Sequence, residues 1–254
     1  WGAIYNDTPV GEGGNGGLCP SQNLVDMYDM ANGQSPFSSY DETGAPVYNG
    51  TATPAINNTS GYKSNDPYSN RDPRLYNGVN WGNGIINVLK GQRDNPQGNA
   101  NATPTGYYTR KYIPEVILNN NHTGSNYRNW IIIRYAEILL NYAEALNEAG
   151  GSRTDVLNAI QPLRDRVGMT AKLTDRSELA FEDHRAWDVR RWNVAEKALA
   201  RPIYGMEITK ENGKFVYTRK VAQNRVFTEK MYLYPIPEGE VWKTNIENNP
   251  GWNN

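Results

Sequence analysis

One stretch of thirteen residues, AFEDHRAWDVRRW at positions 180–192, contains the side-chain types that active sites use. It combines acids, a histidine and arginines with large aromatic residues. On a helix, His184 and Asp188 stand four positions apart and project from one face. Three interpretations are open: a general acid/base pair, part of a metal site, or an ion-pair network that holds helices together.

The residues available in the whole chain disfavour a zinc-type site. Such a site needs three or four nitrogen, sulfur or carboxylate ligands. The sequence has two histidines, His122 and His184, and one cysteine, Cys19, with no HExxH or CxxC motif. A carboxylate-rich metal site is the form of metal binding that this composition leaves open.

We therefore favour the ion-pair network, because such networks are common where no catalysis occurs. The network pairs Glu182 and Asp183 with Arg185 and Arg190, and Asp188 with Arg191 or His184, above Trp187 and Trp192. If His184 is part of such a clamp, His184→Ala lowers the stability by roughly 1–3 kcal/mol and leaves ligand affinity unchanged.

Other motifs that could carry chemistry are weak. GEGGNG at 11–16 matches a phosphate-binding glycine pattern, but neither a buried strand before it nor a helix after it is predicted. Cys19 has no readable histidine partner, which indicates an inert thiol. Acids in the loops are scattered, so the carboxylate pair of a glycoside hydrolase is an alternative without a defined site. We expect no catalytic residue, no metal and no cofactor.

Composition narrows the classes of partner. The 254 residues include 26 basic and 27 acidic side chains, and this balance argues against a nucleic-acid partner. No apolar run reaches the roughly 20 residues that a membrane span needs. Tyrosine and tryptophan number 17 and 7 against 4 phenylalanines. Rings with a polar group suit surfaces that bind partly polar ligands, but loop-rich proteins also place tyrosine at half-buried positions.

The first half of the chain, residues 1–126, is dense in Gly, Pro, Asn, Ser and Thr. One helix is predicted there, over 21–31, with Ser21 as N-cap and Leu24, Met27 and Tyr28 on one face. Short strands are predicted at 84–89 and 105–113. Long loops of this kind in a compact domain usually serve binding.

Helices dominate the next part of the chain. Residues 129–151 carry Tyr135, Ile138, Leu139, Tyr142 and Leu146 at helical spacing, and Gly150 and Gly151 end the pattern. A second helix over 152–169 buries Leu157, Ile160, Leu163 and Val167, with a kink or loosened turn at Pro162. A third helix is predicted over about 178–200, and Asn212-Gly213 predicts a β-hairpin over 205–218.

The pair of helices at 129–169 spans about 34 residues with its turn, which is the tetratricopeptide period. An adaptor that binds a peptide or protein in its helical groove is therefore an alternative function. Such repeats need neighbours to cover their apolar faces, and no second copy is found in the chain. We expect an incomplete folding unit, in which Tyr135, Leu139 or Leu157 is abnormally exposed or covered by another chain. The Trp at position 1 agrees with a processed or partial chain.

Seven segments in order resemble one family. They are CPSQNLVDMYDMANG, NDPYSNRDPRLY, TGYYTRKYI, the helix pair NWIIIRYAEILLNYAEALNEAGG…VLNAIQPLRDRVGM, ELAFEDHRAWDVRRW, YLYPIPEGEV and NNPGW. From about residue 19 to the end, the chain resembles the C-terminal half of the SusD/RagB family of nutrient-binding outer-membrane lipoproteins. In that family the AFEDHRAWDVRRW stretch belongs to the scaffold.

The resemblance implies a mainly α fold: a tetratricopeptide-like α-α superhelix with long irregular loops and a small β-hairpin. It implies a non-enzymatic protein on the outer face of the outer membrane of Bacteroidetes-type bacteria, lipid-anchored through an N-terminal segment. The protein would bind oligosaccharide or polysaccharide and deliver it to a SusC-like TonB-dependent transporter. Residues 1–126 would face the glycan, 127–200 would form the scaffold, and 201–254 the hairpin and C-terminal segment.

Glycan binding indicates particular residues. Sugar rings stack their C–H faces on Trp or Tyr, while amides bind the hydroxyls. Trp1, Tyr5, Asn80 and Trp81 lie in Gly/Asn-rich loops of the half expected to face the ligand. The stretch between Met169 and Glu178 is short for the family, so we expect a discontinuity or an abrupt loop there.

Overall fold

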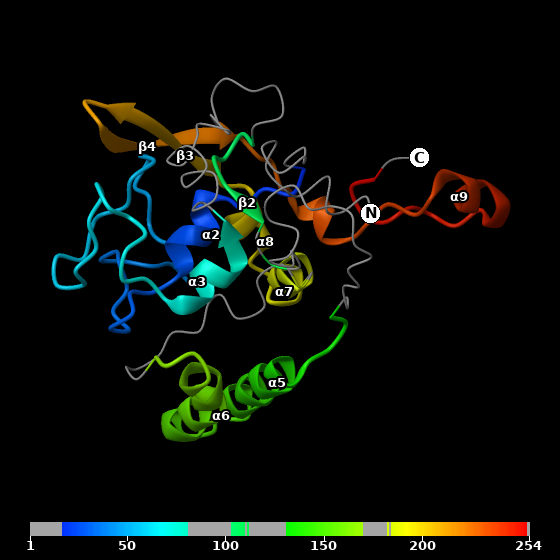
Figure 1. The fold of residues 1–254 in the computed structure, drawn as a ribbon. Helices are drawn as coiled ribbons and strands as arrows, with labels where there is room; N and C mark the ends of the chain where they lie inside the picture. The colour runs from blue at the N-terminus through cyan, green and yellow to red at the C-terminus, as the bar shows by residue number, and fades with distance from the viewer. Residues whose placement is uncertain are drawn as a thin grey trace, which may run out of the picture.

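The computed structural model describes residues 17–80, 103–109, 111, 131–169, 182 and 184–252. Its elements are α2 (Gln22–Met27), α3 (Pro73–Gly78), β1 (Val79–Asn80), β2 (Tyr108–Thr109), α5 (Tyr135–Glu148), α6 (Arg153–Asp165), α7 (Arg185–Arg191), α8 (Ala195–Leu199), β3 (Ile203–Glu211), β4 (Lys214–Gln223), the 3-10 turn η3 (Glu229–Tyr232) and α9 (Glu238–Thr244). Two small antiparallel sheets, β1–β2 and β3–β4, accompany the helices (Figure 1). The expected helices, irregular loops and small hairpin are therefore present.

The first helix begins where expected and ends early. The Ser21 hydroxyl accepts a hydrogen bond from the backbone N–H of Leu24 at 3.2 Å, which is the predicted N-cap. The helix stops at Met27 rather than at 31, because the following backbone pairs with a distant segment. Met30 forms an isolated antiparallel β-bridge with Arg71. A local pattern could not indicate this competing partner.

The hairpin forms one core with the loop-rich first half. Buried side chains from both regions meet in a single cluster: Val25, Tyr28, Tyr68, Leu75, Tyr107, Met206 and Ile208. In Figure 1 the β3–β4 hairpin lies above α2 and α3, with the early loops beside them. Irregular segments are thus fixed here by burial rather than by regular hydrogen-bond ladders.

Two glycines allow the hairpin to approach this core closely. The N–H of Met206 donates to the carbonyl of Thr105 at 2.8 Å. A Cβ on Gly106 would lie 2.2 Å from the Met206 carbonyl oxygen, and a Cβ on Gly205 would lie 2.7 Å from the Cα of Thr105. Gly106 also has φ +76°, which side-chain-bearing residues rarely adopt. Both positions therefore require glycine.

The predicted hairpin turn is confirmed. Glu211 pairs with Lys214 across Asn212 and Gly213, whose φ angles are 49° and 81°. Two successive positive φ angles match the twist of the strands in a tight turn, which is why Asn-Gly is favoured there. The strands extend further than the pattern suggested, over 203–211 and 214–223.

Helices α5 and α6 form an antiparallel pair as expected. Ser152 caps α6 by accepting from the N–H of Asp155 at 3.1 Å, and Gly150 takes φ +74° in the turn. Small side chains allow the two helices to pack: Ala136 and Ala143 on α5 and Ala159 on α6 are buried. Of the four residues expected to be buried in a helix over 152–169, Leu163 is buried and Leu157, Ile160 and Val167 are half-buried.

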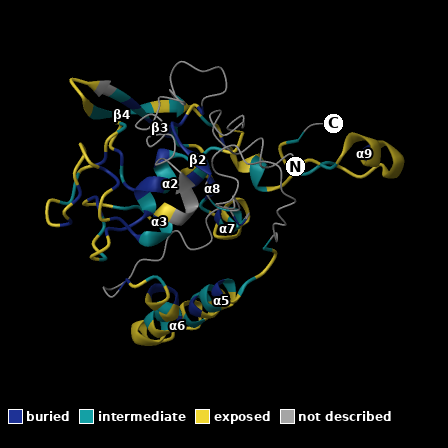
Figure 2. Cartoon of the chain, viewed as in Figure 1, coloured by how far each residue is buried: buried dark blue, intermediate teal, exposed yellow. Residues whose placement is uncertain are grey.

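The outer face of α5 is apolar and exposed. Tyr135 is 72 % exposed, Tyr142 56 % and Ile138 50 %. Leu139 is half-buried. The exposure expected for Tyr135 is confirmed, and Figure 2 shows the exposed colour along the outer sides of α5 and α6.

The third helix was predicted as one element over 178–200, and this prediction is wrong for the described part. Two short helices, α7 and α8, are separated by a turn in which Asn193 takes φ 57°. The N–H of Val194 then donates back to Val189. The turn lets both helices bury side chains against Phe227 in a second core cluster. The expected discontinuity between 169 and 178 and the strand at 84–89 lie outside the described residues.

Among the described residues, no helix combines the length and the apolar character that crossing a bilayer requires.

Candidate functional site

Three of the four residues expected to bind glycan, Trp1, Tyr5 and Trp81, lie outside the described residues. The fourth, Asn80, ends β1, where its backbone pairs with Tyr108 of β2. The side chain of Tyr108 is only 1 % exposed, and Thr109 donates its hydroxyl to the Leu18 carbonyl at 2.9 Å. The short β1–β2 ladder therefore fixes the backbone from which residue 81 continues.

The tyrosines of the early loops mainly fill the core. Buried tyrosines here are Tyr28, Tyr48, Tyr62, Tyr68, Tyr107 and Tyr108. The hydroxyls of Tyr68 and Tyr107 lie 3.0 Å apart, and the Tyr107 hydroxyl also donates to Gln22. Of the two interpretations of the tyrosine excess, structural use in loops holds for these residues. The hydroxyls of Tyr68 and Tyr107 satisfy one another inside the core.

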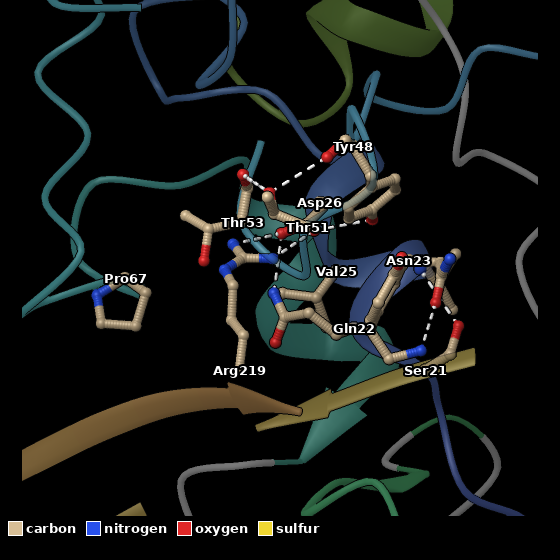
Figure 3. Close-up of polar contacts among 12 residues, drawn as sticks. Ser21, Gln22, Asn23, Val25, Asp26, Tyr48, Thr51, Thr53, Pro67 and Arg219 are labelled. Atoms are coloured by element: carbon tan, nitrogen blue, oxygen red, sulfur yellow. Dashed lines mark hydrogen bonds and ion pairs between the residues drawn. The ribbon is translucent and has the colours of Figure 1, made fainter. Parts of the chain in front are cut away.

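A buried ion pair lies at the centre of this tyrosine-lined core. Asp26 of α2, which is 0 % exposed, meets Arg219 of β4, with Arg219 Nη2 donating to Asp26 Oδ1 at 2.7 Å (Figure 3). The Tyr48 hydroxyl donates to Oδ2 at 2.9 Å, and Gln22 Nε2 donates to Oδ1 at 2.7 Å. Arg219 also donates to the Tyr62 hydroxyl at 3.1 Å. We call these five residues the Asp26 network.

The electrostatics of the Asp26 network are those of a structural clamp. Burial alone would lower the pKa of Arg219, but the adjacent Asp26 carboxylate raises it above its ordinary value. Burial and the same carboxylate raise the pKa of Tyr48. Both oxygens of Asp26 accept hydrogen bonds from neighbouring side chains, so the carboxylate is fully engaged within the core. Sequence analysis missed this pair because its members are 193 positions apart.

The AFEDHRAWDVRRW stretch forms a line of polar contacts with α5 and its flanks. Glu182 pairs with Lys111 and with Arg134, whose Nε lies 2.7 Å from Glu182 Oε2. His184 Nε2 lies 3.6 Å from Glu137 Oε2. Further along, Glu144 accepts from Arg191 and, at 2.9 Å, from Trp192 Nε1. The stretch thus connects α7 to α5, as the network interpretation predicts.

The individual pairs differ from those predicted. Glu182 was expected to pair with Arg185 or Arg190, but Arg190 donates to the carbonyls of Ala186 and Met231 instead. Asp188 pairs with Arg191 at 3.2 Å, as expected. Trp192 lies beneath the charges as predicted, since the Arg191 guanidinium is 5.3 Å from the centre of its ring, and it is 46 % exposed. Trp187 is 62 % exposed and contacts Tyr234 instead. Asp183 lies outside the described residues.

The charge on Glu182 is stabilised by its partners. Burial tends to raise the pKa of this carboxyl, but hydrogen bonds and charge from Arg134 and Lys111 lower it overall. In the described part of the chain, no group of three His, Cys, Asp or Glu side chains could hold a metal ion. Cys19 is a half-buried free thiol.

Large exposed aromatic side chains gather on the helical and C-terminal parts. Trp187 and Tyr234 (58 % exposed) come from segments far apart in sequence, and their ring centroids are 6.1 Å apart. Arg190 lies over the Tyr234 ring at 5.3 Å. Trp242 of α9 is 76 % exposed, on the C-terminal arm that extends away from the other helices in Figure 1. Sequence analysis singled out none of these as a surface.

Known proteins similar to this chain agree with one another. A SusD-like protein P2 of Formosa agariphila is 27 % identical over 165 residues, which are 56 % of this chain and 30 % of that protein. A solved SusD-like protein of Bacteroides fragilis superimposes with a TM-score of 0.70 at 28 % identity, covering 94 % of this chain and 48 % of the other. A SusD-like carbohydrate binding protein of the same species gives a TM-score of 0.66 at 24 % identity, covering 94 % and 50 %.

The chain therefore spans half or less of the length of these relatives. The last of them, at 24 % identity, bears on the fold alone. The sequence model of the SusD family matches residues 2–252, nearly the whole chain. That match confirms the resemblance carried by the seven segments, and the chain belongs to the SusD family.

Proposed function

We propose that the chain is part of a non-catalytic protein that binds oligosaccharide or polysaccharide at the bacterial cell surface. The observation that carries this proposal is the family match over residues 2–252. Membership of the SusD family, whose resemblance implies glycan binding, supports a glycan as the ligand. The carboxylates of Asp26 and Glu182 are paired with arginine or lysine, which supports a role without catalysis.

The glycan would contact the loop side of the molecule, residues 1–126. We propose Trp1, Tyr5 and Trp81 as rings for stacking on sugar faces and Asn80 as a hydrogen-bonding amide. The core of tyrosines and the Asp26 network supports this proposal, because a binding loop needs a rigid base to keep its ligand contacts in place. The backbone of Asn80 is held by its pairing with Tyr108, which is itself buried.

The helical part would serve as the scaffold. We propose that α5 and α6 are one unit of a tetratricopeptide-like superhelix over 127–200, with 201–254 adding the hairpin and C-terminal segment. The exposed apolar face of α5 supports this proposal, because helical repeats bury such faces against neighbouring repeats. The protein would be lipid-anchored at the outer face of the outer membrane and would deliver its glycan to a SusC-like TonB-dependent transporter.

The experiment is a calorimetric titration of the purified protein with a panel of oligosaccharides. Trp81→Ala is expected to weaken binding about tenfold, because the loss of a stacking ring costs up to about 1.5 kcal/mol. Trp242→Ala is the matched control, since it removes an exposed tryptophan from α9. Unchanged affinity in Trp81→Ala would contradict the proposed site.

Two other outcomes address the alternatives. Release of sugar from an oligosaccharide, lost on changing one Asp or Glu, would favour a glycoside hydrolase. Loss of ligand binding in Tyr142→Ala, with Trp81→Ala unaffected, would favour an adaptor that uses the α5 face.

A further inference from the structure

Three arginines from separate elements gather at one place. Arg185 begins α7, Arg201 follows α8 and Arg225 follows β4. Arg185 Nη2 donates to the Thr43 carbonyl at 3.0 Å, and Arg201 Nη2 donates to the Thr43 hydroxyl at 3.2 Å. Arg225 Nε donates to the carbonyl of Arg201 at 3.1 Å. These contacts hold the three guanidinium groups together.

Among the described residues, the negative charge near the cluster is smaller than its positive charge. Within the described part of the chain, the carboxylate that pairs with any of the three is Asp41, at 2.8 Å from Arg201. Arg185 and Arg225 are instead directed at backbone carbonyls, including Ala198 at 3.3 Å from Arg225 Nη2. Each guanidinium has five N–H donors, so donors and positive charge remain. The nearby Glu42 is paired with Lys197.

Mutual repulsion agrees with this imbalance. Burial lowers the pKa of Arg185 and of Arg225, and the charge of Arg201 lowers each further. Asp188 and Asp41 act in the opposite direction on Arg185 without reversing the change. Asp188 itself pairs with Arg191 at 3.2 Å. A negatively charged ligand would relieve the repulsion.

We propose that Arg185, Arg201 and Arg225 form a binding site for an oxyanion, the carboxylate or sulfate group of an acidic saccharide. The planar fork of a guanidinium matches these groups and binds them through two parallel hydrogen bonds. Arg185 is exposed as a whole residue although its guanidinium is partly covered, and Arg201 and Arg225 are half-buried, so the cluster is reached from solvent at Arg185. The anion site stands on the arginines alone, whereas the choice of saccharide rests on the proposed function.

The first experiment measures sulfate binding by thermal unfolding of the purified protein. Sodium sulfate replaces sodium chloride at constant ionic strength. The rise of the thermal unfolding midpoint with sulfate concentration gives the affinity of the protein for sulfate. We expect Arg185→Gln and Arg225→Gln each to weaken sulfate binding about tenfold. Asp41→Asn, which keeps the Oδ1 acceptor used by the Thr43 N–H, is expected to strengthen it.

Arg153→Gln is the control, because it removes one exposed arginine from α6. If sulfate raises the unfolding midpoint equally in all variants, sulfate stabilises the protein without a specific site and the proposed anion site is refuted. Arg225→Lys is the substitute variant if Arg185→Gln does not fold. It keeps the positive charge but loses the planar guanidinium, so we expect weaker sulfate binding. Unchanged sulfate binding in Arg225→Lys would contradict the proposed site.

The second experiment titrates an oligosaccharide bearing carboxylate or sulfate groups and its neutral counterpart. The proposal expects tighter binding of the acidic form, with the difference lost in Arg185→Gln. An acidic preference that survives this change would place the saccharide elsewhere and overturn the ligand assignment. Binding of sulfate without binding of any saccharide would refute the proposed function and leave the anion site intact.

Discussion

The loop-rich region and the α5–α6 pair use opposite means to reach a defined structure. The loop region has little regular secondary structure, yet it buries tyrosines, an ion pair and the inner side of the hairpin in one core. The α5–α6 pair is fully regular, yet Tyr135, Ile138 and Tyr142 remain exposed. Regular hydrogen bonding and a complete core are therefore separate properties in this molecule.

The change with the largest expected effect on stability removes the carboxylate of the Asp26 network. Asp26→Ala leaves Arg219 buried without its partner, and breaking a buried pair in this way costs about 3–5 kcal/mol. Urea denaturation measures the loss. Glu240→Ala, which breaks an exposed pair on α9, is expected to change stability by less than about 0.5 kcal/mol. Similar losses in both variants would show that the Asp26 network does not hold the loops.

The next test concerns the close crossing of hairpin and loop. Gly106→Ala adds a Cβ where the Met206 carbonyl stands and where φ is positive, so we expect a loss of at least ~2 kcal/mol. Gly61→Ala is the matched control, because φ is +82° there and no atom lies within 4 Å. Its expected cost is the backbone term alone, about 1 kcal/mol. Equal thermal midpoints for the two variants would refute the crowded crossing.

The helix pair is tested on its two faces. Ala143→Leu overfills the contact with α6 and is expected to cost about 1–3 kcal/mol. Tyr142→Ser, on the exposed face of the same helix, should change the unfolding free energy of this 254-residue chain by less than about 0.5 kcal/mol. A large loss from Tyr142→Ser would mean that the outer face is already covered.

The smallest expected effect lies where α7 meets α5, and it depends on pH. Folding lowers the pKa of the Glu182 carboxyl below its unfolded value, which is near 4.5. The ionised carboxylate therefore stabilises the folded state above pH 4.5, and this stabilisation is lost as the pH falls through the folded pKa. Glu182→Gln should cost ~1 kcal/mol at pH 7 and progressively less below pH 4.5. Denaturation at a series of pH values checks this, and a pH-independent loss would contradict it.

Local signals in the sequence were sufficient for the elements that depend on neighbours in the chain. Ser21 and Asn212-Gly213 act where the patterns indicated, since caps and tight turns involve a few adjacent residues. The seven family segments indicated the family, and the match over 2–252 confirms it. The predicted helix over 178–200 was wrong because Asn193 turns the chain to reach Phe227, a contact that periodicity does not contain.

Long-range partners explain most of the remaining errors. The sequence indicated that Glu182 is paired, but the partners Lys111 and Arg134 come from distant segments. The arginine cluster was invisible for the same reason, since Arg185, Arg201 and Arg225 belong to three elements. The predicted contributions of Trp1, Tyr5, Asn80 and Trp81 to glycan binding remain predictions, because stacking on a sugar depends on ring positions that composition cannot give.

The separation of Asp26 and Arg219 has a consequence for the order of events during synthesis. At about 5–20 residues per second, a ribosome adds the intervening 193 residues in roughly 10–40 s. For that time Asp26 has no Arg219 to pair with, whereas every residue through which α5 and α6 contact each other has already been made. We expect a nascent chain stopped at residue 202 to protect amides of α5–α6 from hydrogen exchange and not those of α2.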